Sequence, residues 1–131
     1  MNLKEFAETY IKAESEAWQK GKLDALQALE DPNVVYHSHI RDRVGWEAQK
    51  QDIIRAPQNM SNLRMEGKYV TGDGNLFALS CKWRFITMRD VPGLWPIGKE
   101  VTSDSLRLFR LENGKLAESW EQNRYTVSDP A

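Results

Sequence analysis

The chain has 131 residues, enough for one domain with its own hydrophobic core, and its 18 basic and 19 acidic residues nearly cancel to a net charge of −1. Because the basic residues form no stripe, we expect no nucleic-acid partner. The apolar runs are too short to cross a membrane, and the first ten residues lack the apolar segment of a secretory signal. The single cysteine, Cys81, excludes an internal disulfide. These features predict one cytoplasmic domain over residues 1–131.

The first part of the chain predicts two helices. Asn2 can cap a helix that runs to about Lys20, because apolar side chains recur at helical spacing over this stretch. Gly21 ends this helix, and a shorter helix is expected over Leu23–Leu29. The Asp-Pro-Asn sequence at residues 31–33 then predicts a turn. We interpret the two helices as a lid or support.

A short strand is predicted over Val34–His39, where β-branched and aromatic residues cluster. His37 and His39 are two residues apart and therefore share one face of that strand. A metal pair, a ligand-facing general base and two ordinary strand histidines are all compatible with this spacing. No third ligand is signalled nearby, so we expect no bound metal.

The middle of the chain predicts a third helix and a hairpin. Residues 41–43 form a charged loop that is expected to be solvated. Trp46 to about Arg55 then has helical apolar spacing, and Ala56-Pro57 closes the helix. Strands are expected over Leu63–Thr71 and Leu76–Arg89. The second strand has the pattern of a half-buried strand, with one face formed by Phe77, Leu79, Cys81, Trp83 and Phe85.

The loop over residues 90–98 is rich in Pro and Gly and also carries Leu, Trp and Ile. Loops are usually polar, so this loop is expected to lie against the protein, a partner or a ligand.

The last predicted element is a long hairpin, Val101–Glu112 against Lys115–Tyr125, because Asn113-Gly114 suits a type I′ turn. Neither arm is cleanly amphipathic. In the first arm Asp104 shares a face with Leu106, which indicates either a partly solvated sheet end or a pocket with a few polar groups. In the second arm one face is expected to hold Leu116, Glu118, Trp120, Gln122 and Arg124.

Helices followed by two hairpins predict an α+β domain with the helices on one face of a curved, mainly antiparallel sheet. This order of elements, together with the run LFRLENGKLAESW from Leu108 to Trp120, resembles that of the SnoaL-like polyketide cyclases. These belong to the nuclear-transport-factor-2-like superfamily, which also includes ketosteroid isomerases. The resemblance extends to His37 with the run GWEA that begins at Gly45, and to the run GKEV that ends at Val101. It covers nearly the whole chain.

The resemblance implies a single SnoaL-like domain in which a cone-shaped, curved antiparallel sheet wraps around the N-terminal helices and encloses an apolar pocket. Similar proteins often pair sheet to sheet, so we expect a homodimer. The resemblance places His37 on the pocket wall and Trp120 in the last strand. Family enzymes commonly carry an acid two or four residues after this tryptophan, whereas here Gln122 and Arg124 occupy those positions.

The missing acid leaves proton transfer to His37, Asp104 or Glu118, because a carboxylate in an apolar cavity gains the raised pKa that acid–base catalysis requires. We predict a pocket in which His37 and Asp104 are the catalytic groups. The substrate-binding side chains are expected to be Trp83, Trp95, Glu118, Trp120, Gln122 and Arg124.

The expected function is that of a lyase, isomerase or cyclase without cofactor, acting by proton transfer on a small hydrophobic oxygenated compound. The alternative is a non-catalytic, dimeric small-molecule-binding protein. Ligand binding without turnover of any ketone, enone or epoxide would favour the alternative.

Overall fold

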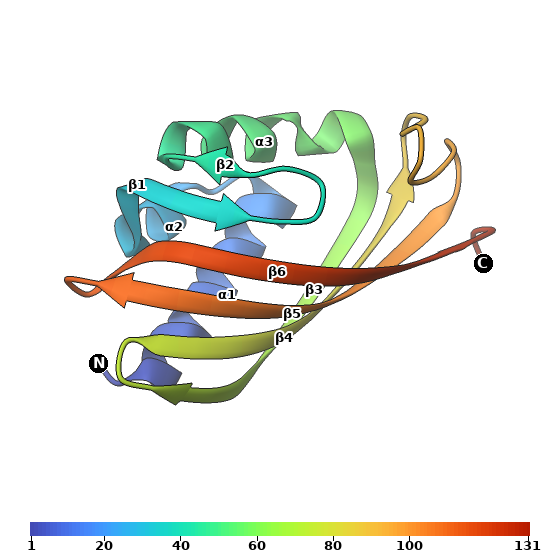
Figure 1. Cartoon of the computed structure of the whole chain (residues 1–131). Helices are drawn as coiled ribbons and strands as arrows, with labels where there is room; N and C mark the ends of the chain where they lie inside the picture. The colour runs from blue at the N-terminus through green and yellow to red at the C-terminus, as the bar shows by residue number, and fades with distance from the viewer.

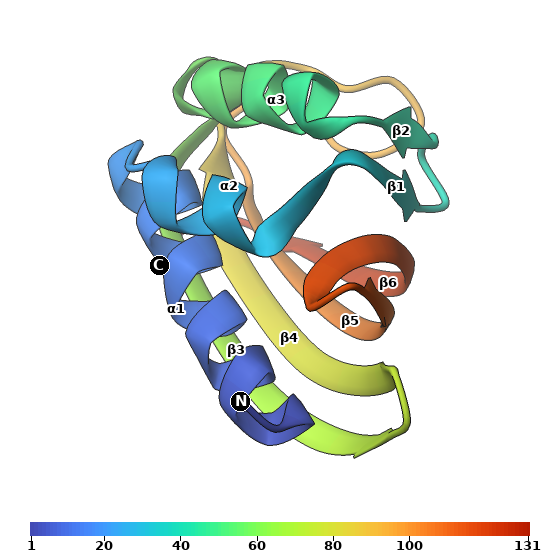
Figure 2. The same cartoon turned by 90° about the vertical axis from the view of Figure 1, so that its left-hand side faces the viewer.

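The computed structural model describes all 131 residues. Figure 1 shows a strongly curved sheet, and Figure 2 shows the helices on its concave side. This arrangement confirms the predicted fold class. No helix combines the length and the apolar character needed to cross a membrane. The elements in chain order are α1 (Leu3–Lys20), α2 (Asp24–Leu29), β1 (Glu30–His37), β2 (Arg43–Val44), α3 (Trp46–Asn59), β3 (Met60–Asp73), β4 (Leu76–Thr87), β5 (Glu100–Glu112) and β6 (Lys115–Ser128).

The sheet has six strands in the order β2-β1-β6-β5-β4-β3. Strands β3 to β6 form the predicted antiparallel meander, which is confirmed. One pairing departs from the expected antiparallel sheet, because β1 lies parallel to β6. The chain returns from β1 through β2 and α3, so α3 is positioned across the open end of the concave side (Figure 1).

The β5–β6 hairpin turns at Asn113-Gly114, with φ of 52° at Asn113 and 76° at Gly114. Positive φ at both central residues is the requirement of a type I′ turn, so the predicted turn chemistry is confirmed. Glu112 lies opposite Lys115 immediately beside this turn. The tight turn starts the two long strands in a defined register.

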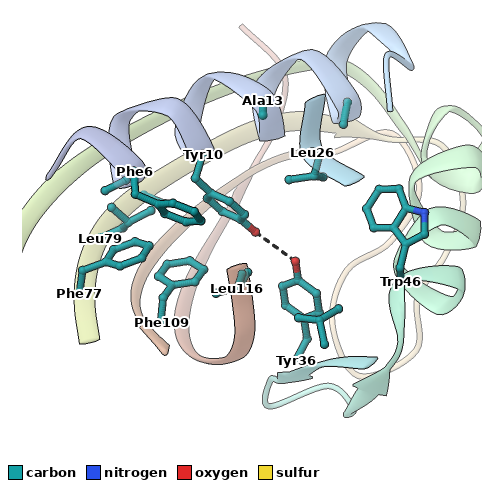
Figure 3. Close-up of a cluster of buried hydrophobic side chains, with 14 of the residues drawn as sticks. Phe6, Tyr10, Ala13, Leu26, Tyr36, Trp46, Phe77, Leu79, Phe109 and Leu116 are labelled. Carbon is teal, nitrogen blue, oxygen red and sulfur yellow. Dashed lines mark hydrogen bonds between the residues drawn. The ribbon is translucent and has the colours of Figure 1, made fainter. Parts of the chain in front are cut away.

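Helix α1 begins and ends as its sequence predicts. The Asn2 side chain accepts a hydrogen bond of 2.8 Å from the Glu5 amide, and Gly21 ends the helix with φ of 71°. Its inner face packs closely on the sheet at Gly67 of β3, where an added Cβ would lie 3.0 Å from the Ile11 side chain. The core between α1 and the sheet is drawn in Figure 3 and includes Phe6, Tyr10, Phe77, Leu79 and Phe109.

The predicted boundaries of β1 and α3 are wrong. Strand β1 begins at Glu30 and ends at His37, so the expected turn at residues 31–33 is an irregularity within the strand, and His39 lies beyond it. Helix α3 continues past Pro57 to Asn59. Proline removes one backbone hydrogen bond, and so close to the end of a helix this loss does not stop the last turn.

Candidate functional site

A cavity of about 320 Å³ opens on the concave side of the sheet, between α3, the β1–β2 loop, the β4–β5 loop and strands β5 and β6. Its volume lies at the lower end of the range for small-molecule sites. The wall combines aromatic rings with charged and polar groups. The cavity is lined by Trp18, Ser38, Ile40, Arg41, Arg43, Asp52, Arg55, Ala56, Asn59, Met60, Trp83, Phe85, Trp95, Ser103, Glu121, Asn123 and Tyr125.

The aromatic side chains of the cavity contact one another in two groups. The Trp18 and Trp83 rings are 5.2 Å apart. Trp95 touches Phe85 on one side, at 5.5 Å, and Tyr125 on the other, at 5.1 Å. Edge-to-face contacts of this kind hold the rings in defined orientations. The structure therefore places Trp83 and Trp95, two of the predicted ligand-binding residues, on the cavity wall.

Trp95 reaches the cavity from the apolar β4–β5 loop. The loop is held by Thr87, whose hydroxyl donates to the Pro96 carbonyl at 2.7 Å and accepts from the Lys99 amide at 2.8 Å. A single backbone bridge between Val91 and Trp95 closes the tip. The loop thus lies against the protein, which is one of the three positions expected from the sequence; the others were against a partner or a ligand.

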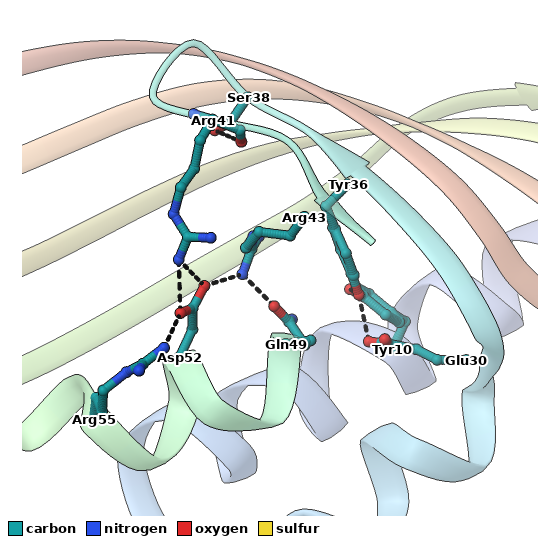
Figure 4. Close-up of polar contacts among 9 residues, drawn as sticks. All are labelled: Tyr10, Glu30, Tyr36, Ser38, Arg41, Arg43, Gln49, Asp52 and Arg55. Atoms are coloured by element: carbon teal, nitrogen blue, oxygen red, sulfur yellow. Dashed lines mark hydrogen bonds and ion pairs between the residues drawn. The ribbon is translucent and has the colours of Figure 1, made fainter. Parts of the chain in front are cut away.

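Three arginines gather at one side of the cavity around a single carboxylate (Figure 4). One Arg41 nitrogen lies 2.8 Å from both oxygens of Asp52. Arg43 and Arg55 approach the same carboxylate at 3.3 and 3.1 Å. Arg43 also donates to Gln49 and stacks 4.8 Å above the Tyr36 ring. The charged β1–β2 loop, expected to be solvated, therefore contributes to the cavity wall.

The opposite side of the cavity is formed by inward-facing residues of β5 and β6. Asn123 donates to the Ser103 hydroxyl at 2.9 Å, while its own amide oxygen is buried without a partner. Burial, and then the charge of Glu121, raises the pKa of Tyr125 to about 12. The Glu121 carboxylate is 3.9 Å from the guanidinium of Arg107. This wall thus places a carboxylate, a phenol and an amide in one cavity.

Arg107 connects the cavity wall to a chain of polar groups in the core. It makes two hydrogen bonds to Glu14 of α1, at 2.6 and 2.8 Å. Glu14 accepts from the Tyr10 hydroxyl at 3.2 Å, and the Tyr10 and Tyr36 hydroxyls are 3.1 Å apart (Figure 3). Tyr36 in turn donates to the buried carboxyl of Glu30 (Figure 4). Five side chains from three elements, α1, β1 and β5, are therefore linked below the cavity.

His37 lies on the outer face of the sheet, away from the cavity. Its Nε2 is 2.6 Å from Glu118 and its Nδ1 is 3.1 Å from Asp42, and its ring stacks on Trp120. The Glu118 hydrogen bond, supported by Asp42, raises the pKa of His37 above its usual value. His39, beyond the strand, rests against the Tyr125 ring instead. The expectation that His37, Glu118 and Trp120 line the pocket is corrected.

Asp104, Gln122 and Arg124 line a shallow hollow on the same outer face. Asp104 is 3.8 Å from Lys82, and both side chains are more than a third exposed. The expected convergence of the predicted residues in one pocket is therefore wrong for all except Trp83 and Trp95. Side chains alternate between the two faces of a strand, so an error of one residue in phase moves a whole set to the other face.

A β-bulge explains this error in phase for the predicted residues of β6, which are Glu118, Trp120, Gln122 and Arg124. Arg110 lies opposite Glu118, but the next residue, Leu111, lies opposite Leu116, so Ala117 is an extra residue in β6. Leu116 and Ala117 are both buried. Counting alternate positions from Leu116 therefore leads to the outer face beyond the bulge.

Sequence reasoning missed Glu121, Asn123 and Tyr125 for this reason. A signal for them exists in the first arm of the hairpin, where Val101 and Phe109 indicate the buried face. Val101 and Phe109 lie opposite Val127 and Ser119 of β6, which are odd-numbered. Arg107, on the same face of β5, likewise lies opposite Glu121. Counting back from the apolar residues of β5 would have assigned these three side chains to the cavity.

Comparison with known proteins agrees with this architecture. The family model described as SnoaL-like polyketide cyclase matches residues 8–126. The chain belongs to this family. Comparison of the sequence with curated proteins finds no match.

Several solved structures share the fold at low sequence identity. TsrD of Streptomyces laurentii is 14% identical with a TM-score of 0.78, covering 94% of this chain and 91% of its own. IdmH of Streptomyces antibioticus, a candidate polyketide cyclase, is 20% identical with a TM-score of 0.69, covering 89% and 91%. A Catenulispora acidiphila protein with a ketosteroid isomerase-like fold, solved with trimethylamine, is 16% identical with a TM-score of 0.66, covering 86% and 83%. At these identities the likeness is one of fold, so the chemistry must be argued from the cavity.

Proposed function

We propose that this SnoaL-like protein is a lyase, isomerase or cyclase that needs no cofactor and moves a proton on a small hydrophobic, oxygenated compound in the concave cavity. The observation that carries the proposal is Glu121, a carboxylate inside a cavity with aromatic walls. It directly follows Trp120 in β6 and faces the opposite side of the sheet. Glu121 thus takes the role that the sequence alone assigned to His37 and Asp104.

In this proposal Glu121 is the general base. It takes a proton from the carbon next to a carbonyl group, the C–H bond breaks, and its electron pair forms an enolate. Return of the proton to another carbon gives isomerisation. Attack of the enolate on a second carbonyl of the same molecule gives cyclisation, and the new alkoxide takes the proton from Glu121. In elimination the β-hydroxyl takes that proton and leaves as water. All three outcomes share the first step.

Tyr125 is the proposed donor to the enolate oxygen. With a pKa of about 12, its phenol keeps its proton at neutral pH and has no hydrogen-bond partner within the chain. A donor in a cavity with aromatic walls stabilises developing negative charge more strongly than water does. Asn123, whose amide oxygen lacks a partner, is available to orient a substrate hydroxyl.

The deciding experiment is α-proton exchange with the Glu121→Gln variant. Exchange of deuterium from solvent into 2-tetralone, a bicyclic ketone, reports proton abstraction without knowledge of the natural product and is followed by NMR. Loss of the base is expected to slow enzyme-dependent exchange by about 10²–10⁴-fold. Binding of the ketone, followed by tryptophan fluorescence, is expected to change little because glutamine has nearly the same shape.

Glu112→Gln is the matched control, because it makes the same chemical change at an exposed position beside the β5–β6 turn. It is expected to exchange at the wild-type rate. Binding of the ketone by the wild type with no exchange would support the non-catalytic binding protein instead. If His37→Gln or Asp104→Asn instead lost exchange by this factor while Glu121→Gln remained active, the catalytic group would lie on the outer face of the sheet.

We also propose that the outer face of the sheet forms the contact of a homodimer. Exposed apolar side chains gather there on β5 and β6: Leu106 is 64% exposed, Leu108 40% and Trp120 38%. Leu108 lies opposite Trp120 in the register, so the two form one patch. An apolar patch on a sheet face is typical of a surface that a partner covers, and the same patch on both copies suits a two-fold contact.

Light scattering at micromolar concentration is expected to give a dimer for the wild type and a monomer for Leu106→Lys, since a lysine at the centre of an apolar contact must be desolvated. Val70→Lys is the control, because Val70 is also exposed, at 53%, but lies on edge strand β3. A wild-type monomer, or a dimer unaffected by Leu106→Lys, would contradict this assignment of the outer face.

A further inference from the structure

We propose that the three arginines around Asp52 bind the carboxylate of the substrate, so that the ligand of this cavity is a hydrophobic acid. The inference rests on the proposed function in that it names the substrate class of the same cavity. It concerns Arg41 and Arg43 of the β1–β2 segment, and Arg55 of α3 (Figure 4). None of these residues belongs to the proton-transfer step.

The local charge is out of balance. Arg41, Arg43 and Arg55 carry three positive charges, and Asp52 is the one carboxylate that they contact. The cluster therefore carries a net charge of +2, and with Glu121 the cavity lining as a whole carries +1, whereas the whole chain carries −1. Guanidinium groups held close together repel one another, so an added anion is favoured at this position.

The hydrogen bonds are also out of balance. Each oxygen of Asp52 accepts twice: Oδ1 from Arg41 and Arg55, and Oδ2 from Arg41 and Arg43. Each arginine, in contrast, uses only one of its three guanidinium nitrogens in these bonds. Apart from the bond from Arg43 to Gln49, the remaining N–H groups of the three guanidinium groups have no acceptor within the chain. A planar carboxylate matches the paired N–H groups of a guanidinium.

The three arginines differ in freedom. Arg43, with a side chain 17% exposed, is held by Gln49 and by the ring of Tyr36. The side chains of Arg41 and Arg55 are 55% and 57% exposed. Arg43 therefore supplies a positive charge in a fixed position, whereas Arg41 and Arg55 can turn towards a ligand with little loss of packing.

The neighbouring wall decides what kind of anion fits. Trp83, Phe85 and Trp95 line the same cavity as the arginines. An inorganic anion would not cover the cavity-facing surface of these rings, whereas a ligand with rings at one end and a carboxylate at the other would contact both the rings and the arginines. Hydrophobic burial then supplies affinity, and the arginines fix the orientation of the ligand.

Calorimetric titration with 2-naphthoate and 2-naphthamide tests the inference, because the two probes have the same shape and differ in charge. The wild type is expected to bind naphthoate about tenfold or more tightly than naphthamide at low salt, as charge-assisted hydrogen bonds predict. In the double variant Arg41→Gln/Arg55→Gln this preference should fall close to one. Arg84→Gln, on the outer face of β4, is the control and should retain it.

Asp52→Asn provides a change in the opposite direction. Removing the competing carboxylate should strengthen naphthoate binding and leave naphthamide binding unchanged, which loss of fold would not do. Equal affinities of the wild type for the two probes would overturn the inference, as would an equal loss of both in the arginine double variant. Tight binding of inorganic phosphate together with equal affinities would reduce the cluster to a simple anion site.

The anion site and the proposed catalysis can fail separately. If Glu121→Gln exchanges 2-tetralone at the wild-type rate while naphthoate remains preferred, the proton-transfer proposal fails and the acid-binding inference stands. If Glu121→Gln loses exchange while naphthoate is not preferred, the catalytic proposal stands and its substrate is not an acid.

Discussion

Arg107→Met is expected to lower the free energy of unfolding by about 3–5 kcal/mol, because it leaves the carboxylate of Glu14 buried without its counter-charge. The two side chains are only 6% and 5% exposed and are joined by two short hydrogen bonds. Arg107 also lies 4.7 Å above the Phe109 ring. After the substitution, only the Tyr10 hydroxyl remains to satisfy Glu14. Urea unfolding followed by circular dichroism measures the loss.

The double variant Glu14→Leu/Arg107→Met measures the net contribution of the ion pair to stability, without the additional cost of leaving one buried charge unpaired. Two apolar side chains in place of the ion pair are expected to be less destabilising than either single change, since neither leaves a buried charge behind. Lys82→Met removes an exposed pair with Asp104 and should cost at most about 1 kcal/mol. If Arg107→Met is as mild as Lys82→Met, water must reach the Arg107–Glu14 pair.

Much of the fold could be predicted because local chemistry and the global arrangement agree. Asn2, Gly21 and Asn113-Gly114 each have the backbone geometry that their residue types favour. The alternation of Phe77, Leu79 and the residues after them shows which face of β4 is buried. Signals of this kind depend on neighbours in sequence and need no knowledge of the tertiary structure.

The site was harder to predict because it depends on one extra residue and on contacts between distant elements. The bulge at Ala117 reverses the facing of all later residues of β6, and no composition rule marks it. The cluster around Asp52 joins a loop before α3 to the helix itself, and a charged loop by itself looks solvated. Likewise, Glu14 can be buried in α1 because it is paired with Arg107, which lies in a strand 93 residues later in the sequence.

Glu30→Gln is expected to remove most of the loss of stability that the wild type suffers between about pH 5 and pH 8. Burial raises the pKa of Glu30 from 4.5 to about 8, against the hydrogen bond from Tyr36, which favours the charged form. Glu14 adds to the increase, and Arg43 and Arg107 oppose it. One Glu30 oxygen is buried without a partner, so a negative charge there would be poorly compensated.

The direction of the effect follows from proton binding. Between the two pKa values the folded protein holds a proton on Glu30 that the unfolded chain has released, so the free energy of unfolding falls as the pH rises. The stabilisation is complete below pH 4.5 and is lost as the pH passes through 8. At its steepest the fall is about 1.4 kcal/mol per pH unit. Glutamine still accepts from Tyr36 but binds no proton, so Glu30→Gln should be more stable than the wild type at pH 8.

His37 must be separated from Glu30, because its raised pKa acts in the same direction. Its contribution is present below the usual histidine value of 6.5 and is lost as the pH rises through the folded pKa. Between pH 5 and 6 the larger part of the slope therefore belongs to Glu30, because His37 begins to contribute only near the upper end of this range. Urea unfolding of the wild type, Glu30→Gln and His37→Gln should show this lower part of the slope in the wild type and in His37→Gln. The larger part of the fall in the free energy of unfolding between pH 5 and 6 should be absent from Glu30→Gln. If it persists in that variant, Glu30 is ionised in the folded protein, and the hydrogen-bonded chain through Tyr10 and Tyr36 ends on a carboxylate.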